Sequence, residues 1–154
     1  MGIDKNPYIV ALKMLARREL TERQVRERLA RRGFDQDDID TAVARLKGDR
    51  SLDETRVALA MARSEVILKR HGRLRAQRQL ETAGLSAAIA RTALDEVFSS
   101  IDHHALIGAA LGRRLRGTRA IEDEAEFRRL YRFLIGQGFD SDLVLKTLKA
   151  RRIK

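Results

Sequence analysis

The stretch ERLARRGF, residues 27–34, has the sequence of a helix end, and the chain carries the same pattern twice more. The second copy is RQLETAGL, residues 78–85, and the third is RFLIGQGF, residues 132–139. Each copy reads Leu-x-x-x-Gly followed by an apolar residue, and its glycines are Gly33, Gly84 and Gly138, separated by 51 and 54 residues. A pattern that recurs at a nearly constant spacing predicts tandem structural repeats.

Glycine has a physical reason to stand at this place in the pattern. A helix that ends in a left-handed residue favours glycine there, because glycine has no Cβ to clash. In the Schellman turn, the residue after the glycine packs back onto an apolar residue in the last turn of the helix. The pattern therefore predicts three equivalent contacts, which are Phe34 on Leu29, Leu85 on Leu80 and Phe139 on Leu134.

Another helix is predicted to begin directly after each turn. Good N-cap residues stand there, namely Asp35, Ser86 and Asp140. Apolar residues then recur with helical spacing, at Ile39, Val43 and Leu46, at Ala90, Leu94 and Val97, and at Val144 and Leu148. The next position of the third stripe is Arg151, so we expect the last turn of that helix to fray into solvent.

Each repeat is predicted to contain two further helices, both before its glycine turn. Thr21 with Gln24 forms a capping box before the helix that ends at Gly33, and residues 73–83 and 124–137 are its counterparts. The first helices are expected at about residues 8–18, 53–70 and 102–115, with Asp53 as the N-cap of the second and a loop within residues 112–123. No stretch alternates between apolar and polar residues as a strand does.

The sequence thus predicts an all-α protein of three tandem three-helix repeats, residues 1–52, 53–100 and 101–154. Units of this size cannot bury all their apolar surface alone, so each should pack on its neighbours in an elongated array that can curve. The composition agrees, with 44% hydrophobic residues, 5% aromatic residues and a single Pro among 154 residues.

Composition also narrows the classes of function. Cysteine is absent, which excludes disulfides and thiolate metal sites. The polar N-terminal segment and the lack of a long apolar run predict neither a signal peptide nor a membrane span, so we expect a cytoplasmic protein, and a monomer. A net charge of +10 and a pI near 10.8 favour acidic partners, with simple solubility as the alternative explanation.

The chain resembles the RecX family of RecA regulators over about residues 11–148. The resemblance rests on ALKMLARRELTERQVRERLARRGF (11–34), RL (45–46) before LDE (52–54), HG (71–72) with the second glycine turn, and RFL (132–134) with the third. The sequence departs from the family at ALAMARSEVIL (58–68), where aromatic residues are common, and at Gly72-Arg73, where the family has a glycine-proline type of turn.

This resemblance implies a regulatory protein of recombination, DNA repair and the SOS response. It implies binding in the groove of the RecA filament on single-stranded DNA, with inhibition of ATP hydrolysis and strand exchange. It implies no enzymatic activity, and no cofactor is expected.

Two basic runs are the candidate contacts with such a partner, and their residues are Lys69, Arg70, Arg73, Arg75 and Arg78 in the first and Arg113, Arg114, Arg116 and Arg119 in the second. The arginines of the second run are expected to be free to reach a partner because most of them precede or enter a loop. The alternative for both runs is a solvated helix face. A third set of arginines is interleaved with acids and is expected to form mostly surface ion pairs; it comprises Arg17, Arg18, Arg23, Arg26, Arg28, Arg31 and Arg32.

No catalytic or metal-binding pattern stands out. His103 and His104 are adjacent, so on a helix they point about 100° apart and make a poor metal clamp. Two other classes remain open: a direct DNA-binding protein of the helix-turn-helix type, and a protein–protein scaffold unrelated to recombination.

Overall fold

The computed structural model describes residues 5–116 and 119–152, and these residues form nine α-helices and one π-helix. The helices are α1 Pro7–Arg17, α2 Glu22–Arg31, α3 Gln36–Gly48, α4 Glu54–Arg63, η1 Ser64–Leu68, α5 Arg73–Thr82, α6 Ala87–Ser99, α7 His103–Gly112, α8 Glu124–Gly136 and α9 Ser141–Ala150. The β-structure of the described residues is a single isolated bridge between Ile121 and Arg152. The predicted all-α class is therefore confirmed.

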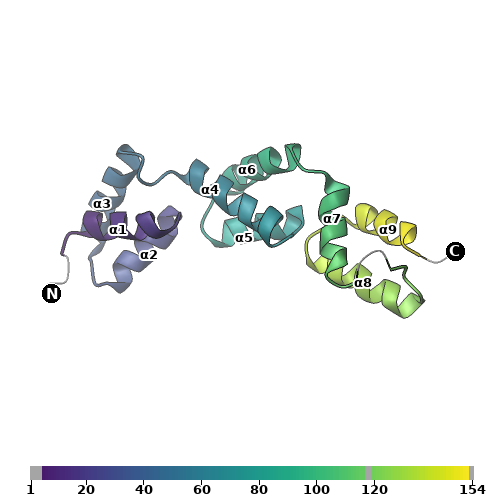
Figure 1. Cartoon of the computed structure of the whole chain (residues 1–154). Coiled ribbons are helices and arrows are strands. Elements are labelled where there is room, and N and C mark those ends of the chain that lie inside the picture. The colour runs from purple at the N-terminus through teal and green to yellow at the C-terminus, as the bar shows by residue number, and fades with distance from the viewer. Residues whose placement is uncertain (1–4, 117–118, 153–154) are drawn as a thin grey trace.

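The helices lie in three groups of three along an elongated molecule, with the two ends of the chain at opposite ends (Figure 1). Helix α1 packs on α2 and α3, α4 packs on α5 and α6, and α7 packs on α8 and α9. We call these the first, second and third groups. They agree with a three-helix repeat, and the unit boundaries after residues 52 and 100 remain our proposal.

The three glycine turns have the predicted left-handed conformation. Gly33, Gly84 and Gly138 have φ values of +92°, +110° and +97°. In each turn the glycine N–H donates to the carbonyl three residues back, at 2.9–3.0 Å, and the next N–H donates to the leucine carbonyl five residues back, at 3.2–3.3 Å. This is the Schellman pair of hydrogen bonds.

The two apolar residues of each turn belong to one core cluster or pack against it. Leu80 lies in one core cluster with Leu85, and Leu134 lies in the same cluster with Phe139. The partly buried Phe34 packs on the cluster that contains Leu29.

Helix capping and core positions also follow the sequence. The predicted N-caps accept hydrogen bonds from backbone N–H groups of the first turn, and they are Asp35, Ser86, Asp140 and Asp53. Thr21 and Gln24 form the expected capping box. The predicted stripe is buried throughout, at Ile39, Val43, Leu46, Ala90, Leu94, Val97, Val144 and Leu148.

The prediction that the last helix frays into solvent is wrong. Helix α9 reaches Ala150, and the Arg151 carbonyl then accepts a hydrogen bond from the Ile121 N–H at 2.7 Å. Ile121 is fully buried, so the loop after α7 returns and covers the end of α9. The loop predicted within residues 112–123 is present, although its residues 117 and 118 lie outside the described residues.

The first helices of the second and third groups are shorter than predicted. The α-helix expected over residues 53–70 ends at Arg63 and continues as the π-helix Ser64–Leu68, and the helix expected over 102–115 ends at Gly112. The wider π-turn is closed by a hydrogen bond from the Lys69 N–H to the Ser64 carbonyl at 3.0 Å.

The second and third groups join where the end of α8 meets the start of α5. Gly72, the N-cap of α5, donates its N–H to the Gln137 carbonyl at 2.7 Å, and Leu74 donates to the Gly138 carbonyl at 3.2 Å. These bonds satisfy N–H groups that lack partners within the helix. A Cβ on Gly72 would overlap the Gly138 backbone, and one on Gly138 would overlap the backbone of Arg75.

The first and second groups meet in a similar way. Thr21, the N-cap of α2, donates its hydroxyl to the Ala83 carbonyl at the end of α5, at 2.6 Å. A Cβ on Gly84 would lie 2.8 Å from the Cβ of Arg23. Gly33 has no atom within 4 Å of such a Cβ in the described chain, so its turn is open. Helices α2, α5 and α8 therefore follow one another end to end.

Candidate partner-binding surface

The two basic runs meet in space although about 40 residues separate them. Lys69 and Arg70 from the first run and Arg113 and Arg114 from the second line one pocket of about 240 Å³. Its other lining residues are Ala110, Phe133 and Gln137. We call it the joint pocket, since it lies where α7 and α8 of the third group approach the turn before α5.

The joint pocket is built by an unusual turn of the backbone. After the π-helix, Arg70 adopts a left-handed conformation with φ of +58°. Its guanidinium then donates to the Ala109 carbonyl of α7 at 3.3 Å. On the opposite wall, the Arg114 guanidinium lies 4.3 Å from the centre of the Phe133 ring. A left-handed arginine costs conformational free energy, and strain of this kind clusters at functional sites.

A buried carboxylate anchors the same turn. Glu65 accepts from the Lys69 ammonium at 2.9 Å, and its other oxygen lies 2.6 Å from Nδ1 of His71. Burial alone would raise the pKa of Glu65, but the hydrogen bonds from Lys69 and His71 hold this pKa below its usual value. Lys69 therefore already has a partner within the protein, in Glu65. Arg113 and Arg114 are exposed at the pocket rim.

The other residues of the first run lie on α5 and differ in their surroundings. Arg73 forms an ion pair with Asp95 and lies over the Phe98 ring. Arg75 is partly buried because its backbone packs on Gly138, and Arg78 is exposed. Neither Arg75 nor Arg78 has an ion-pair partner among the described residues.

The second run also contains arginines with and without an ion-pair partner among the described residues. Arg116 is exposed and has no ion-pair partner in the part of the chain that the structure describes. Arg119 pairs with Glu126 and lies 3.7 Å from Glu122. The hydrogen bond from Arg119 lowers the pKa of Glu126, and the pair ties the loop to α8. The expectation that this run is free is therefore wrong for Arg119.

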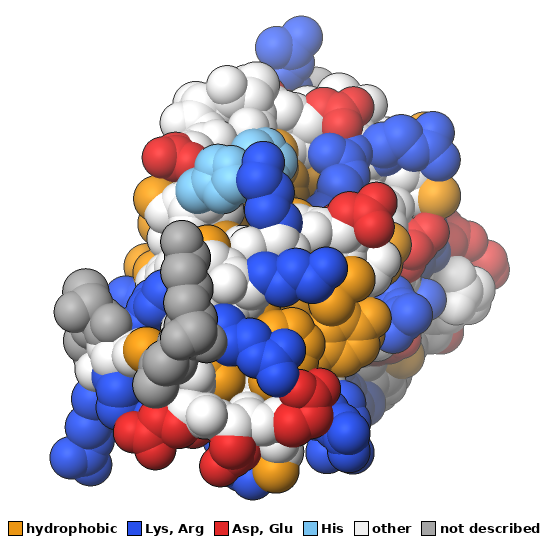
Figure 2. Space-filling view, turned by 90° about the vertical axis from the view of Figure 1, so that its right-hand side faces the viewer, with side chains coloured by type: hydrophobic (Ala, Val, Ile, Leu, Met, Phe, Trp, Pro, Cys, Tyr) orange, Lys and Arg blue, Asp and Glu red, His pale blue; other side chains and the backbone are white. Residues whose placement is uncertain are grey.

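Exposed apolar side chains accompany the basic residues. Leu68, which precedes Lys69, is 71% exposed, and Leu74 on α5 is 61% exposed. Ile67 and Ile135 are further large apolar residues with exposed side chains. Figure 2, which looks onto the C-terminal end of the molecule, shows basic side chains with acidic ones between them and apolar side chains beside them.

A second basic hollow lies on the first group, and the sequence did not predict it. A groove of about 860 Å³ runs between α1 and the end of α2, and its lining residues are Val10, Lys13, Met14, Arg17, Arg18, Arg28, Arg31 and Arg32. We call it the N-terminal groove. Helical spacing could have revealed it, because residues 10, 13, 14 and 17 share one face of α1.

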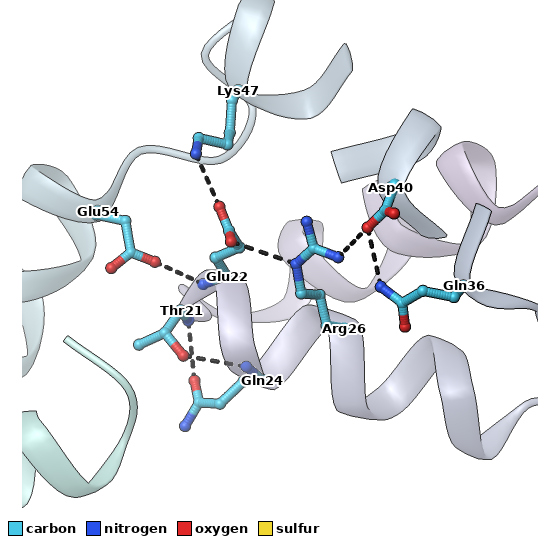
Figure 3. A network of polar contacts seen from close by, with 8 residues as sticks. All are labelled: Thr21, Glu22, Gln24, Arg26, Gln36, Asp40, Lys47 and Glu54. Carbon is cyan, nitrogen blue, oxygen red and sulfur yellow. Dashed lines mark hydrogen bonds and ion pairs between the residues drawn. The ribbon is translucent and has the colours of Figure 1, made fainter. Parts of the chain in front are cut away.

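Among the described residues, the expected surface ion pairs form at two of the seven interleaved arginines. Arg26 binds Glu22 at 3.2 Å and Asp40 at 2.6 Å, and Arg23 lies 3.8 Å from Glu27. Figure 3 shows how Glu22 also binds Lys47, while its backbone N–H donates to Glu54. Glu22 is thus used between helices, and Glu27 pairs with Arg23, neither of which lines the groove.

Metal and membrane sites are not found in the described residues. No cluster of three or more potential metal ligands occurs among them, and none of their helices is both long and apolar enough to cross a membrane. His103 is exposed and stacks on Phe98, with ring centres 5.3 Å apart.

Comparison with known proteins identifies the family. Regulatory protein RecX of Chlorobaculum tepidum is 30% identical over 139 residues, which is 90% of this chain and 84% of that protein. The chain belongs to the RecX family. Regulatory protein RecX of Halorhodospira halophila is 33% identical over 135 residues, covering 87% of this chain and 81% of that one. The profile for the first three-helix domain of RecX matches residues 8–46.

Solved structures agree with the RecX fold. The crystal structure of RecX from Lactobacillus salivarius superposes with a TM-score of 0.74 and 18% sequence identity, and the match covers 94% of this chain and 93% of that one. A second crystal structure of a regulatory protein RecX gives a TM-score of 0.77. At this identity the likeness supports the all-helical fold, and the family itself rests on the sequence relatives.

Proposed function

We propose that this RecX-family protein binds the RecA filament on single-stranded DNA and inhibits its ATP hydrolysis and strand exchange. Membership of a family of regulatory proteins supports a regulator, and the resemblance described above supplies the filament as partner. The observation that carries the proposal is the combination of basic and exposed apolar residues around the joint pocket.

A nucleoprotein partner fits this combination. Protein interfaces use apolar side chains and arginine at their centres. The exposed Leu68, next in sequence to the pocket residue Lys69, the exposed Leu74 of α5 and the pocket residue Arg114 offer both kinds of group. Polyphosphate favours the surrounding cations through the release of counterions. A partner that presents both protein and DNA would contact the apolar side chains with its protein and the cations with its phosphates.

The proposed activity needs no chemistry by this chain. The described residues hold no recognisable arrangement of nucleophile, base and electrophilic group, and we propose regulation by occupancy alone. The protein would bridge neighbouring RecA protomers, for which its elongated form supplies the reach (Figure 1).

Co-sedimentation with RecA on single-stranded DNA, beside RecA-free DNA at the same salt, tests the binding. We expect the protein to sediment with the filament and to slow DNA-dependent ATP hydrolysis by RecA. A hydrolysis rate that stays unchanged when the protein is in excess over RecA would refute the proposal.

A further inference from the structure

The N-terminal groove combines a large open hollow with a uniform charge. Its residues come from α1 and its C-cap and from the last turn of α2 and its C-cap, and among the described residues the lining holds six cations and no carboxylate. The two apolar lining residues, Val10 and Met14, are buried, with 4% and 8% of their surface exposed. They form a closed floor, and the cations form the walls.

The acidic residues near the groove form ion pairs with residues that do not line it. Glu19 binds Arg56 of α4 at 2.9 Å. Glu22 binds Lys47 of α3, also at 2.9 Å, and Glu27, which is not among the lining residues of the groove, lies 3.8 Å from Arg23. These acids therefore pair with residues that do not line the groove, and the described lining of the groove is positive.

Five groove arginines have no ion-pair partner within the described residues, and they are Arg17, Arg18, Arg28, Arg31 and Arg32. Basic side chains in the last turn of a helix do offset its dipole, by about 0.3–1 kcal/mol each. One or two arginines per helix would supply that effect. Gathering all five in one groove adds mutual repulsion, which an anionic ligand would relieve.

The end of α2 beside the groove is open in the described chain. The turns at Gly84 and Gly138 are covered by the preceding group, whereas no atom of the described residues lies within 4 Å of a Cβ placed on Gly33. Arg31 and Arg32 precede that open turn and are exposed. The contacts that cover the other two turns thus have no counterpart beside Gly33 in the described chain, and the arginines at this end of α2 are accessible.

The chemistry of the lining favours nucleic acid over an acidic protein segment. Protein interfaces have an apolar core, but the exposed large apolar residues of the described chain are Ile67, Leu68, Leu74 and Ile135, all outside the first group. Nucleic-acid interfaces are polar and strongly positive, and arginine binds phosphate oxygens with two parallel hydrogen bonds. No aromatic residue is among the described lining residues of the groove, so the lining offers bases no surface on which to stack.

We propose that the N-terminal groove binds the phosphate backbone of nucleic acid without regard to base sequence. This is a second contact surface, separate from the joint pocket, and it does not depend on the proposed inhibition of RecA.

Binding of the full chain to a labelled single-stranded oligonucleotide of mixed sequence, with RecA absent, tests the proposal. The variant Arg17→Gln/Arg28→Gln/Arg31→Gln removes three cations of the groove. Each lost contact with single-stranded DNA lowers the slope of log affinity against log salt by about 0.7, so the slope should fall by about 2. At about 0.1 M salt the affinity should fall roughly a hundredfold. The same variant should lose affinity for a duplex, which offers the same backbone.

A matched control separates the groove from net charge. The variant Arg63→Gln/Arg91→Gln/Arg132→Gln removes the same charge from exposed arginines on other helices, and it should keep most of the affinity. Arg17→Lys/Arg28→Lys/Arg31→Lys should restore most of the binding, which shows that the charges rather than a folding defect are responsible. Equal losses in the groove and control variants would overturn the proposal. So would competition by polyglutamate that matches competition by DNA, because the groove would then fit an acidic protein segment.

Discussion

Gly33, Gly84 and Gly138 share one backbone conformation but have different neighbours. The first is open, the second faces the Cβ of Arg23 and the third faces the backbone of Arg75. The conformation follows from the repeated pattern and could be predicted. The neighbours could not, because local sequence does not say which helix ends will meet.

This difference predicts an order of stability among alanine variants. Gly33→Ala should cost about 1–2 kcal/mol, which is the strain of a left-handed alanine. Gly138→Ala carries the same strain and also forces the joint between the second and third groups apart, at a further cost of about 1–3 kcal/mol. Urea unfolding gives the free energy of unfolding of each variant, and equal m-values would show that the variants differ in stability alone. Equal losses for the two variants would contradict the structure of the joint.

Glu65 provides a residue-scale prediction for pH. Its pKa is lowered in the folded protein, so the stability it contributes is present above the unfolded pKa and is lost as the pH falls through the folded one. At neutral pH, Glu65→Ala should lose about 1–3 kcal/mol, because charged hydrogen bonds with Lys69 and His71 disappear. The difference from the unchanged protein should shrink below the usual Glu pKa of about 4.3. A difference in unfolding free energy that persists at lower pH would show that packing rather than charge is responsible.

At the scale of the elements, the sequence predicted nearly every helix. Caps and stripes are local signals, and they placed the start of α5 at Arg73 and the start of α8 at Glu124. The π-helix was missed because an amphipathic stripe looks much the same when one extra residue is inserted. The bridge from Ile121 to Arg152 was missed because it joins distant segments.

The candidate site was predicted less completely for the same reason. The two basic runs were visible, but their meeting at the joint pocket depends on the left-handed turn at Arg70. The N-terminal groove was missed because its arginines were considered only together with the neighbouring acids along the sequence, although helical spacing places residues 10, 13, 14 and 17 on one face of α1. Glu19 binds α4, which no spacing within α1 and α2 could reveal.

The joint pocket predicts a functional effect of two exposed arginines. Arg113→Ala/Arg114→Ala should weaken binding to the RecA filament at least about tenfold, because interfaces commonly depend on a few arginines. Neither residue has an ion-pair partner among the described residues, so the far-ultraviolet circular dichroism should stay unchanged. Arg91→Ala/Arg132→Ala is the matched control, with exposed arginines outside the pocket. Unchanged filament affinity in the pocket variant would make this surface a solvated face.

At the scale of the whole molecule, the two basic surfaces lie in different parts of one elongated array. The N-terminal groove belongs to the first group, and the joint pocket lies between the second and third. The groups are linked by hydrogen bonds between successive second helices, so the separation between the surfaces is set by the fold. A repeating partner such as a filament offers binding sites at regular intervals, which suits a protein with two separated contacts.

The last prediction distinguishes a filament binder from a simple DNA binder. Contacts with bare single-stranded DNA are mainly electrostatic, and each contributes about 0.7 to the slope of log affinity against log salt. Binding to bare DNA through the groove should therefore weaken steeply as salt is added. Binding to the filament also uses apolar residues such as Leu68 and Leu74, whose contribution salt does not screen. We expect the protein to stay on the RecA filament at salt that removes it from free DNA, as co-sedimentation across a salt series would show. Equal affinities for the two at moderate salt would instead favour the helix-turn-helix alternative.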